Sequence, residues 1–401
     1  MSIIRFSCDR DDLIVPRDDG LWVDTTYDAS TQTGRLGRFP QVDGFDAVSN
    51  QALALRAHLD RVIATHAASL TARKPVVVMV HGFLFNPYDA ALLDRKESDN
   101  PHVRVYHFAP PDDPKEETER HNSAWCHGLG FAPDDAGAEG LAIGFGWYSS
   151  PGLASSMLKG GQNFYARAYD YGTEVAWTLL NLLHHLRAAL NAAGHDNDID
   201  LFCHSLGSHV VLQSVIQACI ENRRIAMANG AGAQEGPLVH MLRGLDRLVI
   251  LGGAEYVREA QLFYEEINRD DLGLKNTESC IVYNVGCREN DVLDTLAENF
   301  GPRFFGNSQV IGHNGLNHSD PYKMWMDLQI DSADLAKWMK SKLGVEILGD
   351  GPGIADHWHY YTYRPNMEMY KGIFRDRAAW SLPALRKAKI PEGIRTTWWG
   401  N

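Results

Sequence analysis

Short apolar runs recur along the chain, and stretches with a helical spacing of apolar residues separate them. The runs lie at 75–80, 142–147, 199–203, 248–251 and 280–283, with a weaker one at 324–328. Continuous apolar runs of this length, rich in β-branched residues, are typical of strands buried on both faces of a parallel sheet. We therefore expect these segments to be the central strands of the protein.

Helices are expected between the strands. Ser49 can cap a helix that leads to the first run, and a helix-like stretch lies at 367–374. Two further stretches place apolar side chains on one helical face, at Val175, Leu179, Leu182 and Leu186 in a helix that stops near Gly194, and at Val211, Val215 and Ala218. This alternation of strands and helices predicts an α/β protein with a mostly parallel sheet covered on both faces.

Three segments interrupt the alternation. Residues 1–46 are rich in turn-forming residues, and we expect them to be irregular, ahead of a single domain at 47–401. Within that domain, 108–140 is rich in Asp, Glu, His, Gly and Pro, and 297–320 is rich in Gly, Asn and His. Long loops of such composition are usually functional or disordered. Both are candidates for a lid over an active site, with inert surface insertions as the alternative.

The charge of the chain disfavours several partners. The formal net charge is −13, and no run of Lys and Arg occurs. Nucleic-acid binding needs a concentrated basic surface, and an anionic membrane would repel this chain. The first residues are charged where a secretory signal has its apolar core, and no apolar run is long enough to span a bilayer. We therefore expect a cytoplasmic protein with no integral membrane segment and no nucleic-acid partner.

The 6 cysteines and 17 histidines raise the question of a metal site. His121, Cys126 and His127 cluster in the sequence, and His357 and His359 could share one side of a strand. However, no His-Glu-x-x-His, paired Cys-x-x-Cys or facial-triad spacing occurs. We expect reduced thiols, no metal ion and no cofactor.

Residues 203–207, with the sequence Cys-His-Ser-Leu-Gly, connect the expected strand at 199–203 to the helix after it. A nucleophilic serine at such a turn has its hydroxyl above the edge of the sheet, and the residues two positions away on either side must be small. Gly207 meets this requirement, and Cys203 is small enough to meet it. The start of the helix also directs N–H groups toward developing negative charge. Ser205 is therefore the candidate nucleophile, with a serine that only caps the helix as the alternative.

This segment resembles the His-containing nucleophile elbow of lipases and esterases in the α/β-hydrolase superfamily, with Cys203 where the first glycine is usual. His81, Gly82 and Phe83, after the first strand, resemble the oxyanion loop of the same superfamily. The resemblance implies an α/β-hydrolase fold in which the backbone N–H groups of Phe83 and Leu206 form the oxyanion hole. It also implies that His81 is a structural neighbour of the loop.

A serine hydroxyl needs a histidine to remove its proton and a carboxylate to orient that histidine. In the superfamily the order along the chain is Ser, then the acid, then His. Asp291, in the loop after the strand at 280–283, stands where the superfamily places its acid, and Asp294 falls on the exposed side of the helix that follows. Glu255, after the preceding strand, is the alternative acid.

The segment 356–361, with the sequence Asp-His-Trp-His-Tyr-Tyr, follows the last expected strand and is the best source of the base. His357, with Tyr360 three residues later, resembles the His-x-x-Tyr arrangement of several superfamily members. His359 is the alternative base. His313 and His318 come too early in the chain for this role, with His318 the next candidate if both fail.

Together these residues predict a serine hydrolase that cleaves a carboxylic ester or a thioester through an acyl-enzyme intermediate. Residues 83–85 suggest a wall for the apolar acyl part of a small-molecule ester, with an ordinary core segment as the alternative. Two other functions stay open: a binding protein that kept the fold without the chemistry, and a lyase or peroxidase that uses the same triad. Amide hydrolysis shares the acyl-enzyme mechanism and also stays open.

Overall fold

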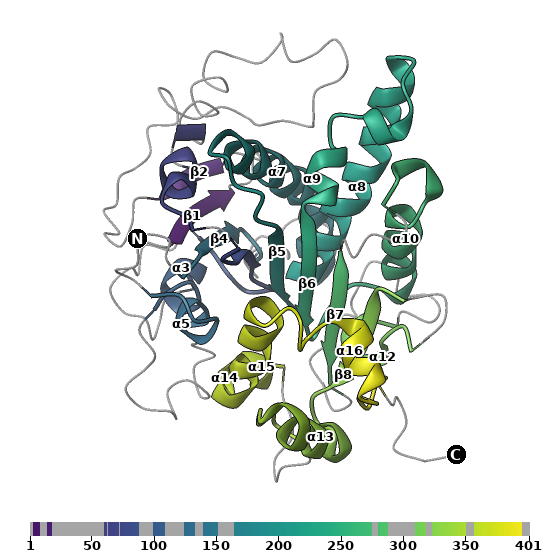
Figure 1. The fold of residues 1–401 in the computed structure, drawn as a ribbon. Coiled ribbons are helices and arrows are strands. Elements are labelled where there is room, and N and C mark those ends of the chain that lie inside the picture. The colour runs from purple at the N-terminus through teal and green to yellow at the C-terminus, as the bar shows by residue number, and fades with distance from the viewer. Residues whose placement is uncertain are drawn as a thin grey trace.

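The computed structural model describes residues 3–8, 14–17, 60–61, 63–71, 73–87, 99–108, 124–132, 139–150, 164–274, 280–287, 309–317, 323–349 and 357–394. In these ranges one central sheet lies between two layers of helices (Figure 1). The strand order is β2-β1-β4-β3-β5-β6-β7-β8. Seven strands pair in parallel, and β2 pairs antiparallel to β1 at the edge.

The strands are β1 (Ile3–Cys8), β2 (Ile14–Arg17), β3 (Val76–Val80), β4 (Leu141–Trp147), β5 (Ile199–His204), β6 (Leu245–Leu251), β7 (Ile281–Gly286) and β8 (Trp325–Gln329). All six strands predicted from apolar runs are present, as β3 to β8, and the α/β class is confirmed. Every residue of β3, β4, β5 and β7 is buried. Burial on both faces explains why their sequences are continuous apolar runs.

The α-helices in the described ranges are α3 (Pro101–Arg104), α5 (Trp125–Gly128), α7 (Phe164–Ala192), α8 (Gly207–Ala228), α9 (Val239–Arg243), α10 (Val257–Ile267), α12 (Ile311–Asn314), α13 (Ala333–Leu343), α14 (His359–Thr362), α15 (Arg364–Arg375) and α16 (Leu382–Lys387), together with helical residues at 60–61 and 63–68. Helices α7, α8 and α15 confirm three predicted helices. The helix predicted from Ser49 is confirmed only at 60–61 and 63–68, because its start lies outside the described ranges. None of the described helices combines the length and the apolar character needed to cross a membrane.

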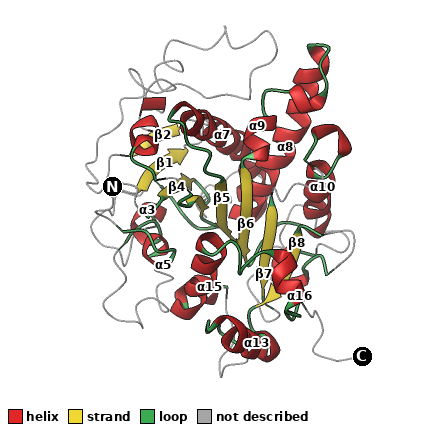
Figure 2. Ribbon diagram, in the orientation of Figure 1, coloured by secondary structure: helices red, strands yellow, loops and turns green. Residues whose placement is uncertain are grey.

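Successive residues of a strand face opposite helical layers, as the pleat requires. In β3, Val76, Val78 and Val80 belong to a hydrophobic cluster with α7, α8 and α10. Val77 and Met79 belong to a second cluster with α5, α13 and α15. Figure 2 shows these two sets of helices on opposite sides of the sheet. The protein therefore has two hydrophobic cores, one on each face of the sheet.

Strand β1 corrects the expectation that residues 1–46 are irregular, because it pairs with β4 along its whole length. Arg5 and Ser7 interrupt its apolar pattern, yet both are buried. The Arg5 guanidinium donates to the Tyr106 carbonyl at 3.0 and 3.2 Å, and Ser7 Oγ lies 2.9 Å from His102 Nε2. These partners are distant in the sequence, so the local pattern does not reveal the strand.

Parts of both expected insertions belong to the core. In the segment 108–140, helix α5 buries Trp125 edge-on against Phe202 of β5, with ring centroids 5.0 Å apart. In the segment 297–320, helix α12 buries Ile311 completely. The described residues of these two segments therefore contribute to the core, and the other residues, on which the lid prediction also depends, lie outside the described ranges.

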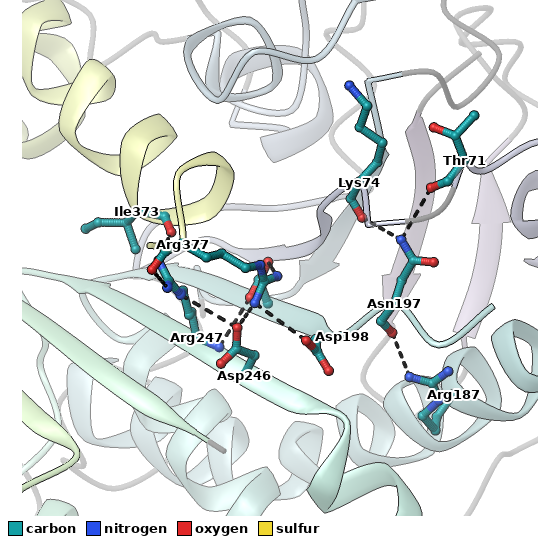
Figure 3. Close-up of polar contacts among 10 residues, drawn as sticks. Thr71, Lys74, Arg187, Asn197, Asp198, Asp246, Arg247, Ile373 and Arg377 are labelled. Carbon is teal, nitrogen blue, oxygen red and sulfur yellow. Dashed lines mark hydrogen bonds and ion pairs between the residues drawn. The ribbon is translucent and has the colours of Figure 1, made fainter. Parts of the chain in front are cut away.

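A charged network lies at the edge of the sheet where β5 and β6 begin (Figure 3). Arg377, after α15, forms an ion pair with Asp246, and its Nη2 donates to Asp200 Oδ2 at 2.8 Å. Arg247 of β6 donates to the carbonyl of Arg377 at 2.7 Å and also to the last turn of α15. The network therefore ties the C-terminal helices to the central strands.

Asp200 is the most deeply buried acid of this network, with no exposed surface. Burial raises the pKa of Asp200 from 3.8 to about 7, although Arg377 and Arg247 favour the charged form. Between these two pKa values the folded protein binds more protons at this site than the unfolded chain does. Ionisation of Asp200 therefore opposes folding, and the stability it removes grows as the pH rises through this window.

We expect Asp200→Asn, which keeps the shape and removes the titration, to alter the pH dependence of stability. From about pH 5 to about pH 8, wild type should lose on the order of 2 kcal/mol of unfolding free energy relative to the variant, because each pH unit between the two pKa values is worth ~1.4 kcal/mol. Urea unfolding at both pH values measures the difference. Asp196→Asn, which changes an exposed acid nearby, is the control, and its unfolding free energy should depend on pH as that of wild type does. If Asp200→Asn and wild type also showed the same pH dependence, ionisation of Asp200 would not oppose folding.

Candidate active site

Ser205 occupies the turn between the end of β5 and the start of α8. It has a φ of +52°, which a non-glycine residue keeps only where its surroundings hold it there. Its N–H donates to the carbonyl of Leu251, at the end of β6, at 2.9 Å. Its carbonyl accepts from the N–H groups of Ala254 at 3.1 Å and Ser208 at 3.0 Å. The strained turn is thus fixed by the loop after β6 and by the first turn of α8.

Glycines stand where this turn touches the end of β3. A Cβ on Gly207 would lie 2.5 Å from the carbonyl oxygens of Val80 and His81. A Cβ on Gly82 would lie 2.6 Å from the Cβ of Ser205. No side chain fits at either position, so the small residue predicted after the serine is a steric requirement. Strand β3 pairs directly with β5, which brings the ends of both strands to the same edge.

Cys203, where the resemblance leads one to expect glycine, is accommodated by the core. Its side chain is fully buried, and its thiol donates to the carbonyl of Val249 in the neighbouring strand at 3.7 Å. Burial raises the pKa of the Cys203 thiol well above its ordinary value. The thiol therefore stays protonated and is a packing group, because only the thiolate is a strong nucleophile.

The loop after β3 is held by Ser149, which follows β4. Ser149 Oγ donates to the carbonyl of Gly82 at 2.8 Å and accepts from the N–H of Phe85 at 2.9 Å. Its backbone N–H donates to the Phe85 carbonyl at 2.9 Å, and its carbonyl accepts from the N–H of Leu84 at 3.3 Å. The sequence does not identify Ser149, because a serine after one strand has no local pattern that marks it as the partner of another loop.

His81 fastens the same loop through its side chain. Its Nδ1 donates to the carbonyl of Gly82 at 2.9 Å, and its Nε2 accepts from the N–H of Trp147 at 2.9 Å. Burial lowers the pKa of His81 to about 3. The imidazole is therefore neutral with both nitrogens engaged, and its role in the loop is structural.

Phe83 and Leu206, the two expected oxyanion donors, lie in the loops that meet at Ser205. Leu206 is the N-cap residue of α8, so its N–H is among the donors that have no acceptor within the helix. Phe83 is half-buried, and its ring lies edge-on to that of Tyr165 in α7, with centroids 5.3 Å apart. Leu84 has a φ of +70° and is 48% exposed. An apolar side chain is thus presented beside the turn.

His357 lies next to this turn although it is distant in the sequence. Its ring centroid is 4.5 Å from that of His204, the residue before Ser205, and only 4% of its surface is exposed. His359 is partly exposed at the start of α14, where its carbonyl accepts from Asn366 Nδ2 at 2.9 Å. Of the two candidate bases, His357 makes this ring contact with the residue that precedes the candidate nucleophile.

Glu255, the alternative acid, is engaged by a cluster of its own. Its Oε2 lies 2.7 Å from Nδ1 of His209 in α8, and its Oε1 accepts from the Tyr169 hydroxyl at 2.6 Å and the Tyr256 N–H at 2.8 Å. Burial acts to raise the pKa of Glu255, but the charge and hydrogen bond of His209 and the bond of Tyr169 outweigh it, so the pKa is lowered. Asp291 lies outside the described residues.

His209 belongs to the cluster around Glu255, and the sequence does not predict it as a functional residue. Its ring stacks on that of Tyr169 with centroids 3.7 Å apart, and its Nε2 lies 2.9 Å from Thr173 Oγ1. The available signal is its position four residues after Ser205, in the first turn of α8. That signal is weak, because its partner Glu255 comes from a different strand.

Across the described ranges, no three His, Cys, Asp or Glu side chains gather at a point that could hold a metal ion. Cys126 is buried in α5, His127 beside it is exposed, and His121 lies outside these ranges. All six cysteines are buried.

No protein-family model, curated protein or solved structure was found that matches the chain.

Proposed function

We propose that the protein is a serine hydrolase of the α/β-hydrolase superfamily that cleaves a carboxylic ester or a thioester with Ser205 as its nucleophile. The observation that carries the proposal is the φ of +52° at Ser205, between a buried strand and a helix. Strain of this kind is concentrated at functional sites. A serine that only caps a helix is typically in the extended region, and here the N-cap position belongs to Leu206.

The place of Ser205 in the sheet also supports the proposal. It follows β5, whose neighbours are β3 and β6. In open α/β sheets, ligands bind outside the carboxyl ends of the strands. The loop after β3 and the loop after β6 both contact the Ser205 turn. A substrate at this edge would therefore meet three loops at once.

In the proposed reaction, His357 takes the proton of Ser205 Oγ as this oxygen attacks the acyl carbon, and Asp291 orients His357. The carbonyl electrons move onto the carbonyl oxygen, and the N–H groups of Phe83 and Leu206 stabilise the resulting oxyanion. The intermediate then expels the alcohol or thiol, which takes the proton from His357. Water attacks the acyl-enzyme by the same route, which releases the acid and restores Ser205.

The proposed substrate is a small-molecule ester with an apolar acyl part. The exposed Leu84 and the half-buried Phe83 are apolar side chains at the loop that would bind the acyl oxygen. Binding sites are lined mostly by such side chains, with a few polar groups that fix orientation. Only 3% of the Ser205 surface is exposed. Ser205 is therefore almost fully enclosed by the residues around it.

A fluorophosphonate probe should label the wild-type protein, because an activated serine attacks the phosphorus. Ser205→Ala should abolish labelling. Ser214→Ala is the matched control in α8, the helix that follows Ser205. Ser214 Oγ donates to the Val211 carbonyl at 2.8 Å, and the variant should label like wild type. Gel fluorescence and peptide mapping measure the result. Labelling of Ser205→Ala, or a folded wild type that stays unlabelled, would refute the serine-hydrolase proposal.

His357→Ala should lower kcat for p-nitrophenyl butyrate by about three orders of magnitude, because the base of the triad is lost. His359→Ala should cost about tenfold or less, ~1.4 kcal/mol. Adding His357→Ala to Ser205→Ala should change the residual rate little, since the two residues act as a unit. The reverse order of effects would assign the base to His359, and two small effects would place it outside this segment.

Ser149→Ala should lower kcat about tenfold, which corresponds to ~1.4 kcal/mol in the activation free energy. The loop that carries the Phe83 N–H then loses the hydrogen bonds of Ser149 Oγ that hold it in place. KM should change little, since the oxyanion forms only after substrate binds. Steady-state kinetics and a thermal melt separate the effect on catalysis from the effect on stability, with Ser214→Ala as control. A lower melting temperature with an unchanged kcat would break the proposed link between Ser149 and the oxyanion hole.

A further inference from the structure

His204, the last residue of β5, makes a side-chain hydrogen bond to the segment that carries His357. Its Nε2 lies 2.9 Å from the backbone carbonyl oxygen of His357, and both residues are buried. A carbonyl oxygen only accepts, so Nε2 carries the proton and donates it. The bond joins the residue before the candidate nucleophile to the backbone of the candidate base.

The His204 ring is confined by its neighbours. It lies perpendicular to the ring of Tyr361, with centroids 4.9 Å apart, and tilted against the ring of His357. On the side of β3, a Cβ on Gly82 would lie 3.2 Å from His204 Nδ1. The absence of a side chain at Gly82 thus leaves room for this ring, and the packing holds its Nε2 toward the His357 carbonyl.

In the described part of the chain, four side chains donate to the backbone carbonyls of residues 357–360, namely those of His204, Thr362, Asn366 and Tyr370. Asn366 Nδ2 donates to the carbonyl of His359 at 2.9 Å, and the Tyr370 hydroxyl donates to the carbonyl of Tyr360 at 2.9 Å. Both of these donors belong to α15, so they fix α14 relative to α15. Thr362 belongs to α14 itself, so of the four donors His204 is the one from the strand that precedes the proposed nucleophile.

We propose that His204 is a positioning residue that sets the location of the His357 imidazole relative to Ser205 through its hydrogen bond to the His357 carbonyl. This inference rests on the proposed function, in which His357 takes the proton of Ser205. His204 does not touch substrate in this proposal and acts through the backbone of the base. Because Ser205 follows His204 directly, the same strand end places both members of the pair.

Loss of this bond should affect the chemical step more than binding. A displacement of about 1 Å of a catalytic group can cost about a hundredfold in rate. His204→Leu keeps a similar bulk and removes the donor, so we expect kcat to fall between about tenfold and a hundredfold with KM within about twofold. His204→Gln can place an amide nitrogen near the position of Nε2, and it should recover most of kcat.

Tyr370→Phe is the matched control. It removes a hydrogen bond to the Tyr360 carbonyl in α14, the short helix after His357, and leaves the hydrogen bond between His204 and the His357 carbonyl in place. It should lower the melting temperature and leave kcat within about twofold. If His204→Leu does not fold, His204→Asn serves as the donor-displaced variant, since its shorter amide cannot reach the His357 carbonyl. His204→Asn should then show the fall in kcat that His204→Gln does not.

The experiment measures kcat and KM for p-nitrophenyl butyrate, with a thermal melt of each variant. A His204→Leu or His204→Asn variant with wild-type kcat would overturn the inference. An equal loss of kcat in Tyr370→Phe, or no recovery in His204→Gln, would do the same, because the role would then be general stability. Failure of the proposed function is distinct: in that case Ser205→Ala and His357→Ala would themselves keep the activity.

Discussion

The close approach of helix α8 to the end of β3 is the contact on which the rest of the site depends. At Gly207 the first turn of the helix lies against the carbonyls that end β3, and at Gly82 the next loop touches Ser205. This approach leaves the serine a left-handed backbone and sets the loop after β3 beside it. The proposed nucleophile and the proposed oxyanion donors therefore share one junction, and a shift of β3 would move them together.

The two edges of the sheet are stabilised by different interactions. At the edge where β5 and β6 begin, a charged network of Asp200, Arg247 and Arg377 is hydrogen-bonded to the last turn of α15. At the opposite edge, hydrogen bonds between backbone groups and the side chains of Ser149, His81 and His204 fix the loops near Ser205. Helix α15 connects the two edges, because Asn366 and Tyr370 in it hold α14. The position of α14, which follows His357, thus depends partly on charges far from the site.

Most of the sheet could be predicted because β3 to β8 are buried on both faces, and this burial appears directly as apolar runs. The turn at Ser205 was also predictable, since steric limits on its neighbours restrict the residue types. Other features depend on partners from distant parts of the chain. In β1, the buried Arg5 side chain donates to the carbonyl of Tyr106. Glu255 stands at a position where the acid of the triad could lie, but its carboxylate is hydrogen-bonded to His209. No local pattern contains these pairings.

The edge strand β2 has a consequence for the order in which the protein assembles. Strand β1 precedes its parallel neighbour β4 by most of the N-terminal third of the chain, whereas β2 follows β1 directly and pairs with it antiparallel. A local hairpin closes a short loop and needs no other part of the sheet. Arg5 in such a hairpin would stay hydrated until the Tyr106 carbonyl and β4 are in place. The burial of its charge then coincides with docking of the hairpin against β4.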